Sequence, residues 1–174
     1  MHKASFYAGI FLVSFAVLML QIIQTRILSV VVWYHLAFFV ISLAMFGLTA
    51  GAVWVYLKGE RFGTKTLSYD LAYFSGLFAF TTAICLAVQM TLAPVITRLA
   101  TTFWVWTELA LCLSLPFFFA GVVISLALTR SPYPVPRVYG FDLAGAAGGA
   151  VGALLVLQAT DGPSAVLWVA VFAA

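Results

Sequence analysis

Long apolar segments alternate with short polar ones along this chain, and the alternation predicts membrane-spanning helices. A helix needs about 20 mostly apolar residues to cross the hydrocarbon core of a bilayer. Four segments are complete by this measure, a fifth is shorter and a sixth begins near the last residue. The predicted helices cover residues 6–23, 33–57, 71–96, 103–129, 143–159 and 165–174. The pattern therefore predicts an all-α fold, a polytopic helical membrane bundle of about six transmembrane helices with the last one truncated.

The sixth segment, residues 165–174, has about half the length of a span and no polar flank. A helix end in the middle of a bilayer would leave polar groups without partners, so we expect the protein to continue beyond Ala174. The first segment follows Lys3, as a signal peptide would. Because no small-x-small cleavage site precedes Arg26, we expect this segment to be retained.

The basic residues indicate an orientation, because cytoplasmic loops of membrane proteins are enriched in Lys and Arg. With the N-terminus in the cytoplasm, six basic residues fall on the inner side and two on the outer side. The inner residues are Lys3, Lys58, Arg61, Lys65, Arg130 and Arg137, and the outer ones are Arg26 and Arg98. We predict a multi-pass protein of the inner (plasma) membrane with a cytoplasmic N-terminus.

The composition excludes a soluble domain. Hydrophobic residues make up 65% of the chain and charged residues 7%, whereas soluble domains carry about 25% charged residues. The net charge of +3 does not indicate a nucleic-acid partner, because the basic residues occur singly at the ends of apolar segments. The lipid bilayer is the expected partner. Cys85 and Cys112 lie inside apolar runs and are interpreted as small core residues, not as a disulfide or redox motif.

Glycines mark the expected contacts between helices, since small residues allow helix backbones to approach closely in a membrane. Within the fifth segment the glycines fall within about 100° of one helical face. The predicted packing residues are Gly47 and Gly51 in the second segment and Gly145, Gly148, Gly149 and Gly152 in the fifth. A dinucleotide-binding loop is excluded at this second group, because a proline-rich stretch and not a strand precedes it.

Polar residues within the first segment form a stripe that has two interpretations. Ser14, Gln21, Gln24 and Thr25 fall within about 100° of one another around a helix. They would either form hydrogen bonds between helices or line a path for a substrate or an ion. Glu108 is the further candidate for such a path. It lies inside the fourth segment and could pair with a basic group at the outer surface, namely Arg26, Arg98 or His35.

Prolines predict two local features. Pro116 removes a backbone donor inside the fourth segment and predicts a kink there. The stretch Arg130–Arg137 contains three prolines and is expected to be an extended, stiff connector. Asp142 would then lie at the start of the fifth helix, where it suits the helix dipole, although it also projects near the glycine face.

No catalytic motif is present in the sequence. It contains no HExxH pair, Walker loop, nucleophile elbow or metal-ligand cluster, so we expect no catalytic residues, no cofactor and no metal site within these 174 residues. Any enzyme activity would have to reside outside this stretch.

Four stretches together resemble a family of bacterial membrane proteins in which a block of transmembrane helices precedes a spermidine synthase-like domain. They are Leu20–Leu28, Phe46–Gly51, Pro116–Gly121 and Tyr139–Gly145. The resemblance implies that the chain is the membrane-anchoring part of a larger protein, whose missing C-terminal cytoplasmic domain would be aminopropyltransferase-like. Two alternatives remain: a transporter or half-transporter for a small metabolite such as a polyamine, and a structural subunit that packs against partner helices through its glycines.

Overall fold

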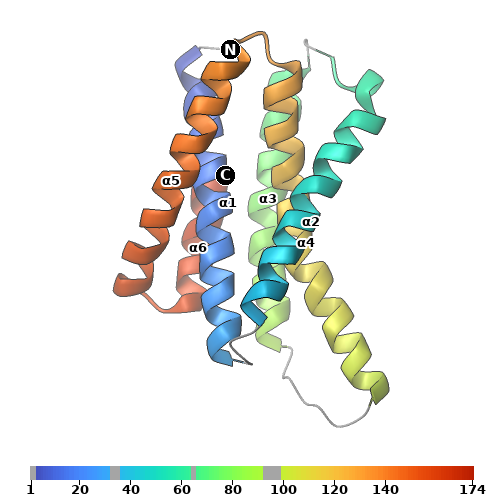
Figure 1. Cartoon of the computed structure of the whole chain (residues 1–174), viewed down its shortest axis with the longest axis vertical. Coiled ribbons are helices and arrows are strands. Elements are labelled where there is room, and N and C mark those ends of the chain that lie inside the picture. Colours follow the sequence, from blue (N-terminus) through green and yellow to red (C-terminus); the bar gives the residue numbers. More distant parts are fainter. Residues whose placement is uncertain (1–2, 32–35, 64–65, 92–98) are drawn as a thin grey trace.

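The computed structural model describes residues 3–31, 36–63, 66–91 and 99–174, which form a bundle of helices (Figure 1). In chain order the elements are α1 (Lys3–Val31), α2 (Leu36–Leu57), the short 3-10 helix η1 (Gly59–Arg61), α3 (Leu67–Thr91), α4 (Leu99–Arg130), α5 (Val135–Ala159) and α6 (Gly162–Ala173). No strand occurs within these ranges. The predicted all-α fold is confirmed.

Five of the helices are long and apolar enough to cross a membrane. Their apolar stretches measure between 21 and 28 residues, whereas a span needs about 20. Large apolar side chains also face outward, among them Phe38, Trp104 and Leu155. Because water would not tolerate so much exposed apolar surface, lipid must cover it. The chain is a multi-pass helical membrane protein.

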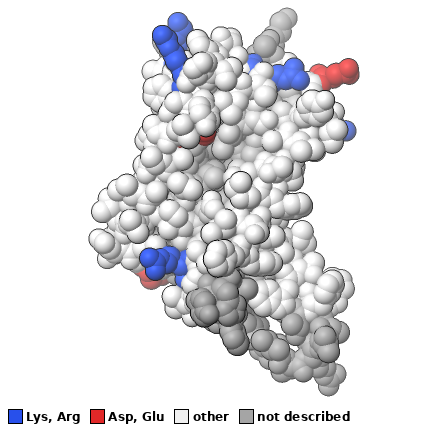
Figure 2. All heavy atoms as spheres, viewed as in Figure 1, with Lys and Arg blue, Asp and Glu red and all other residues white. Residues whose placement is uncertain are grey.

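Apart from Glu108 and Asp142, the charged residues of the described ranges gather at the two ends of the bundle. One end, here named the amino end, holds Lys3, Lys58 and Arg130 at the start of α1, just after α2 and at the end of α4. Arg26 and Asp161 lie at the opposite end. Figure 2 shows a broad belt between the ends in which nearly all of the visible surface is uncharged. This distribution matches a hydrocarbon layer between two aqueous surfaces.

The helices form two closely packed pairs that the remaining helices join. The first pair is α1 with α5, and the second is α2 with α4. Helix α3 packs on α4, and α6 lies between α1 and α3 (Figure 1). Fully buried side chains between these helices include Leu20, Ile23, Phe78, Phe117 and Val169. The core therefore runs through the middle of the bundle, and α1 contributes much of it.

Several helix boundaries differ from the predicted ones. Helix α1 begins at Lys3 and continues past its polar residues to Val31, instead of ending near residue 23. The polar side chains are compatible with the helix, because Thr25 and Ser29 donate hydrogen bonds to the carbonyl oxygens of Gln21 and Thr25, at 2.7 and 2.6 Å. Helices α3, α4 and α6 each begin three or four residues earlier than predicted. The ranges 33–35 and 92–96 lie outside the described residues.

The largest difference is the start of α5. The predicted connector Arg130–Arg137 is not extended throughout, because α5 begins at Val135 and not near residue 143. A proline is tolerated in the first turn of a helix, where its missing N–H has no partner to lose, and Pro136 occupies such a position. As a consequence Asp142 does not lie at the helix start as predicted. It lies about two turns inside α5.

Candidate functional site

The glycine face of α5 brings this helix into backbone contact with α1. Gly145 and Gly149 are buried, and a Cβ atom at either position would overlap the carbonyl oxygen of Phe11 or Phe15, respectively. Gly148 and Gly152 lie against the ring of Phe15, where an added Cβ would approach ring atoms to 3.3 and 2.5 Å. The absence of four side chains is therefore what lets α1 lie so close to α5.

A second close approach joins α2 to α4. A Cβ atom at Gly47 or Gly51 would overlap the carbonyl oxygen of Ser114 or Phe118 of α4, respectively. Gly121 of α4 makes the reciprocal contact, since a Cβ there would lie 2.8 Å from Cα of Leu48. Gly121 was not among the predicted packing residues. The sequence gives no GxxxG signal there, because Gly121 is the one glycine of α4.

A polar pair lies where α1 and α5 meet. Ser14, only 3% exposed, donates a hydrogen bond from Oγ to Oδ1 of Asp142 over 2.5 Å. Asp142 precedes Gly145 by about one turn on the same face of α5. A serine side chain is short, so it can reach a carboxylate on a neighbouring helix only where the backbones are close. The glycine contact and the polar pair are therefore parts of one interface.

The other polar residues of the α1 stripe do not share this partner. Gln21 is half-buried, whereas Gln24 is 4% exposed and its Oε1 atom has no hydrogen-bond partner among the described residues. A buried polar atom without a partner costs about 1 to 3 kcal/mol. Gln24 is thus a destabilising feature of the apolar core unless another molecule supplies a partner.

Replacing Gln24 by methionine should therefore stabilise the protein. Methionine has nearly the same unbranched shape but no amide to satisfy, so we expect the free energy of unfolding to rise by about 1 kcal/mol. Denaturation of the purified chain in detergent micelles measures this. The matched control is Gln21→Met on the same helix, where half-exposure makes the expected gain smaller. A loss of stability on Gln24→Met would show that the amide has a partner.

Glu108 and Pro116 lie in α4, apart from this interface. The helix continues through Pro116, and Figure 1 shows that its first and second halves run in different directions. Glu108, in the first half, is exposed, and no ion pair or hydrogen bond of its side chain is found within the described residues. Two of its expected partners, His35 and Arg98, lie outside those residues. Within the described part of the chain, no hydrogen bond joins Glu108 to Ser14 or Gln24.

Two thiol groups meet between α3 and α4. Cys85 is buried and Cys112 is half-buried, and the two thiols lie close to each other while both remain reduced. They are the two cysteines of the sequence. The spacing in the sequence could not predict this contact, because it depends on how two separate helices pack.

Mild oxidation should therefore link Cys85 to Cys112 within one chain. With copper phenanthroline and oxygen as the oxidant, the two thiols would lose two protons and two electrons and form one disulfide. The product is detected as faster migration on a non-reducing gel and as a linked peptide pair by mass spectrometry. The variant Cys112→Ser should show neither change. Predominant dimer formation would contradict the contact between α3 and α4.

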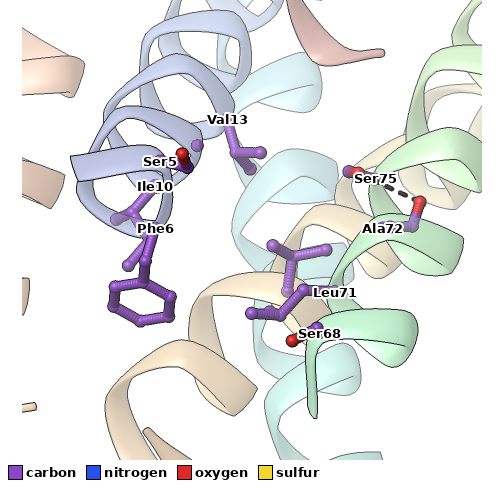
Figure 3. Close-up of a pocket in the computed structure, with 10 residues that line it drawn as sticks. Ser5, Phe6, Ile10, Val13, Ser68, Leu71, Ala72 and Ser75 are labelled. Atoms are coloured by element: carbon purple, nitrogen blue, oxygen red, sulfur yellow. Dashed lines mark hydrogen bonds between the residues drawn. The ribbon is translucent and has the colours of Figure 1, made fainter. Parts of the chain in front are cut away.

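A cavity of about 270 Å³ opens between α1 and α3 at the amino end (Figure 3). The side chains labelled there come from both helices: Ser5, Phe6, Ile10 and Val13 from α1, and Ser68, Leu71, Ala72 and Ser75 from α3. The hydroxyl of Ser75 donates to the carbonyl oxygen of Ala72 in its own helix, at 3.1 Å. None of the lining residues is charged. The cavity suits an apolar occupant and carries no group that could perform acid–base chemistry.

Possible metal ligands do not cluster in the part of the chain that the structure describes: no group of three His, Cys, Asp or Glu side chains could hold an ion there. The described polar groups can form hydrogen bonds between helices, and the basic groups at the amino end can attract anions. Comparisons with protein-family models, with curated proteins and with solved structures found no match to this chain.

Proposed function

We propose that this chain is the membrane-anchoring helical domain of a spermidine synthase-like protein. The observation that carries the proposal is how the stretches of the resemblance lie in the bundle. Phe46–Gly51 packs directly on Pro116–Gly121 through the contacts of Gly47, Gly51 and Gly121. Tyr139–Gly145 packs on α1 through Asp142 and Gly145. Two of the four stretches thus contact each other, and a third packs on α1 at Phe11 and Ser14. Contacts at these positions support a shared architecture over a chance similarity of composition.

The proposed orientation places the amino end in the cytoplasm, in the inner membrane of a bacterium. Lys3, Lys58, Arg61, Arg130 and Arg137 belong to this end, whereas Arg26 is at the other. The excess of basic residues on one side supports a cytoplasmic N-terminus. Alkaline phosphatase, which is active only outside the cytoplasm, should be active when fused after Asp161 and inactive when fused after Gly63. The reverse pattern would refute the orientation.

The anchoring role is tested on the complete gene product. The reading frame after the codon for Ala174 should encode an aminopropyltransferase-like domain, and the membrane fraction that contains the whole protein should bind decarboxylated S-adenosylmethionine or S-adenosylmethionine. Deletion of residues 3–174 should release this binding activity into the soluble fraction. A stop codon at that point, or a continuation without such a domain, would refute the proposal.

Transport of a small cationic metabolite such as a polyamine is the second candidate, and the Ser14–Asp142 pair favours it. A carboxylate held within the bundle is a residue type that carries cations or protons across membranes. Purified protein in proteoliposomes should then take up labelled spermidine, and Asp142→Asn should reduce the uptake strongly while the fold persists. Absence of uptake by the unmodified protein would exclude spermidine transport by this chain.

A further inference from the structure

A second cavity, of about 510 Å³, lies at the amino end, where α2 ends next to the end of α4. Three basic side chains line it: Lys58 directly after α2, Arg61 in η1 and Arg130 in the last turn of α4. The chain turns sharply here, with the N–H of Arg61 donating to the carbonyl oxygen of Lys58 at 2.9 Å. The turn places Lys58 and Arg61 beside Arg130, which belongs to a distant part of the sequence.

Gly59 determines how closely Arg130 approaches this turn. A Cβ atom at position 59 would lie 2.7 Å from Nη2 of Arg130, so an alanine there would make the guanidinium, the free end of a flexible side chain, move aside. Gly63, in the same connection, has open space around it. Close contact with Arg130 is therefore found at Gly59, in the cavity, and not at Gly63, the other glycine between α2 and α3.

The charges of the cavity are unbalanced. Glu60 supplies one carboxylate against three cations, and no ion pair between Glu60 and these cations is found among the residues that the structure covers. Basic residues at a cytoplasmic helix end help to set the orientation of a membrane protein even when they are scattered. These three basic side chains also line the same cavity, which creates a local site for a negatively charged group.

The surroundings indicate the source of that group. The cavity lies at the level where apolar spans end, which is the level of lipid headgroups. Below it on α2, Tyr56 is 85%, Leu57 71% and Val53 49% exposed, so an apolar surface leads from the cavity toward the middle of the bilayer. A free inorganic anion has no apolar part that could contact this surface, whereas the acyl chains of a lipid would cover it.

We propose that Lys58, Arg61 and Arg130 form a binding site for the phosphate-bearing headgroup of an anionic phospholipid, whose acyl chains lie along the exposed end of α2. Guanidinium groups bind phosphate oxygens in pairs of parallel hydrogen bonds, and Arg61 and Arg130 supply two such groups. The ammonium of Lys58 adds a third positive charge. The inference depends neither on the proposed enzyme domain nor on transport activity.

Native mass spectrometry of the full chain, freed of lipid in detergent, tests the proposal. Phosphatidylglycerol should bind at least about tenfold more tightly than phosphatidylethanolamine with the same acyl chains, as the gain from charge-assisted hydrogen bonds suggests. Inorganic phosphate should not displace it at comparable concentration. Equal binding of the two lipids, or complete displacement by phosphate, would overturn the proposal; the second result would indicate a site for free anions.

Variants separate the site from general electrostatic attraction. Arg130→Gln should weaken phosphatidylglycerol binding about tenfold, whereas Arg137→Gln, which removes the same charge outside the cavity at the same end, should change it less than about twofold. Because Lys58 and Arg61 are exposed, Lys58→Gln/Arg61→Gln should fold normally and also weaken binding. Glu60→Gln should strengthen binding. Equal losses from Arg130→Gln and Arg137→Gln would overturn the proposal.

Gly59→Ala provides a test at constant charge. The added methyl should shift the Arg130 guanidinium and weaken phosphatidylglycerol binding, though less than Arg130→Gln does, while Gly63→Ala, the matched control in open space, should leave it unchanged. If both alanine variants bound the lipid as tightly as the unmodified protein, and the arginine variants did too, the cavity would not be the site.

Discussion

Gly149→Ala should destabilise the protein strongly for a change of one methyl group, by about 3 kcal/mol. The new Cβ would overlap the carbonyl oxygen of Phe15, and a helix backbone cannot move away as a flexible side chain can. Helices α1 and α5 would have to separate along their whole interface. Denaturation of the purified chain with sodium dodecyl sulfate in mixed micelles measures the loss.

Gly140→Ala is the matched control on the same helix. Nothing lies within 4 Å of a Cβ placed there, so alanine should be neutral or should stabilise α5 by up to about 1 kcal/mol, in line with its higher helix propensity. Gly51→Ala extends the test to the α2–α4 contact and should resemble Gly149→Ala, because the backbone of Phe118 is equally close. Similar stabilities for Gly149→Ala and Gly140→Ala would contradict the close approach.

The sequence predicted the fold class and the number of helices because length and apolarity alone decide whether a segment can cross a membrane. It could not predict which helices pair. In a bilayer, lipid tails are as apolar as the side chains, so a small-residue face such as that of Gly145 and Gly149 identifies a contact without identifying its partner. That partner is the backbone of Phe11 and Phe15, two large residues without any packing signature of their own.

The start of α5 shows how a local rule can mislead. The prolines of the Arg130–Arg137 stretch favour an extended connector by their backbone preference, but a proline in the first helical turn is compatible with a helix. The same error put Asp142 at a helix end, where a carboxylate needs no protein partner. Because α5 begins at Val135, Asp142 lies within the bundle, where its carboxylate needs a hydrogen-bond partner, and Ser14 supplies one.

Ser14→Ala should destabilise the α1–α5 interface by about 1 to 3 kcal/mol, because it removes the hydrogen-bond donor and leaves the Asp142 carboxylate without its partner on α1. Ser5→Ala is the control on the same helix. The Ser5 side chain is exposed, so its loss should have little effect. Asp142→Asn should be milder than Ser14→Ala, since the amide oxygen can still accept from the Ser14 hydroxyl.

A double-mutant cycle with Ser14→Ala and Asp142→Ala tests whether the two residues act on each other or only on the helices that carry them. With both groups removed, neither is left unsatisfied, so the double variant should be more stable than the sum of the two single losses predicts, by about 1 kcal/mol or more. Additive losses would mean that the bond contributes nothing beyond its surroundings. In that case the glycine contacts alone would hold α1 against α5, and the carboxylate would be available for other partners.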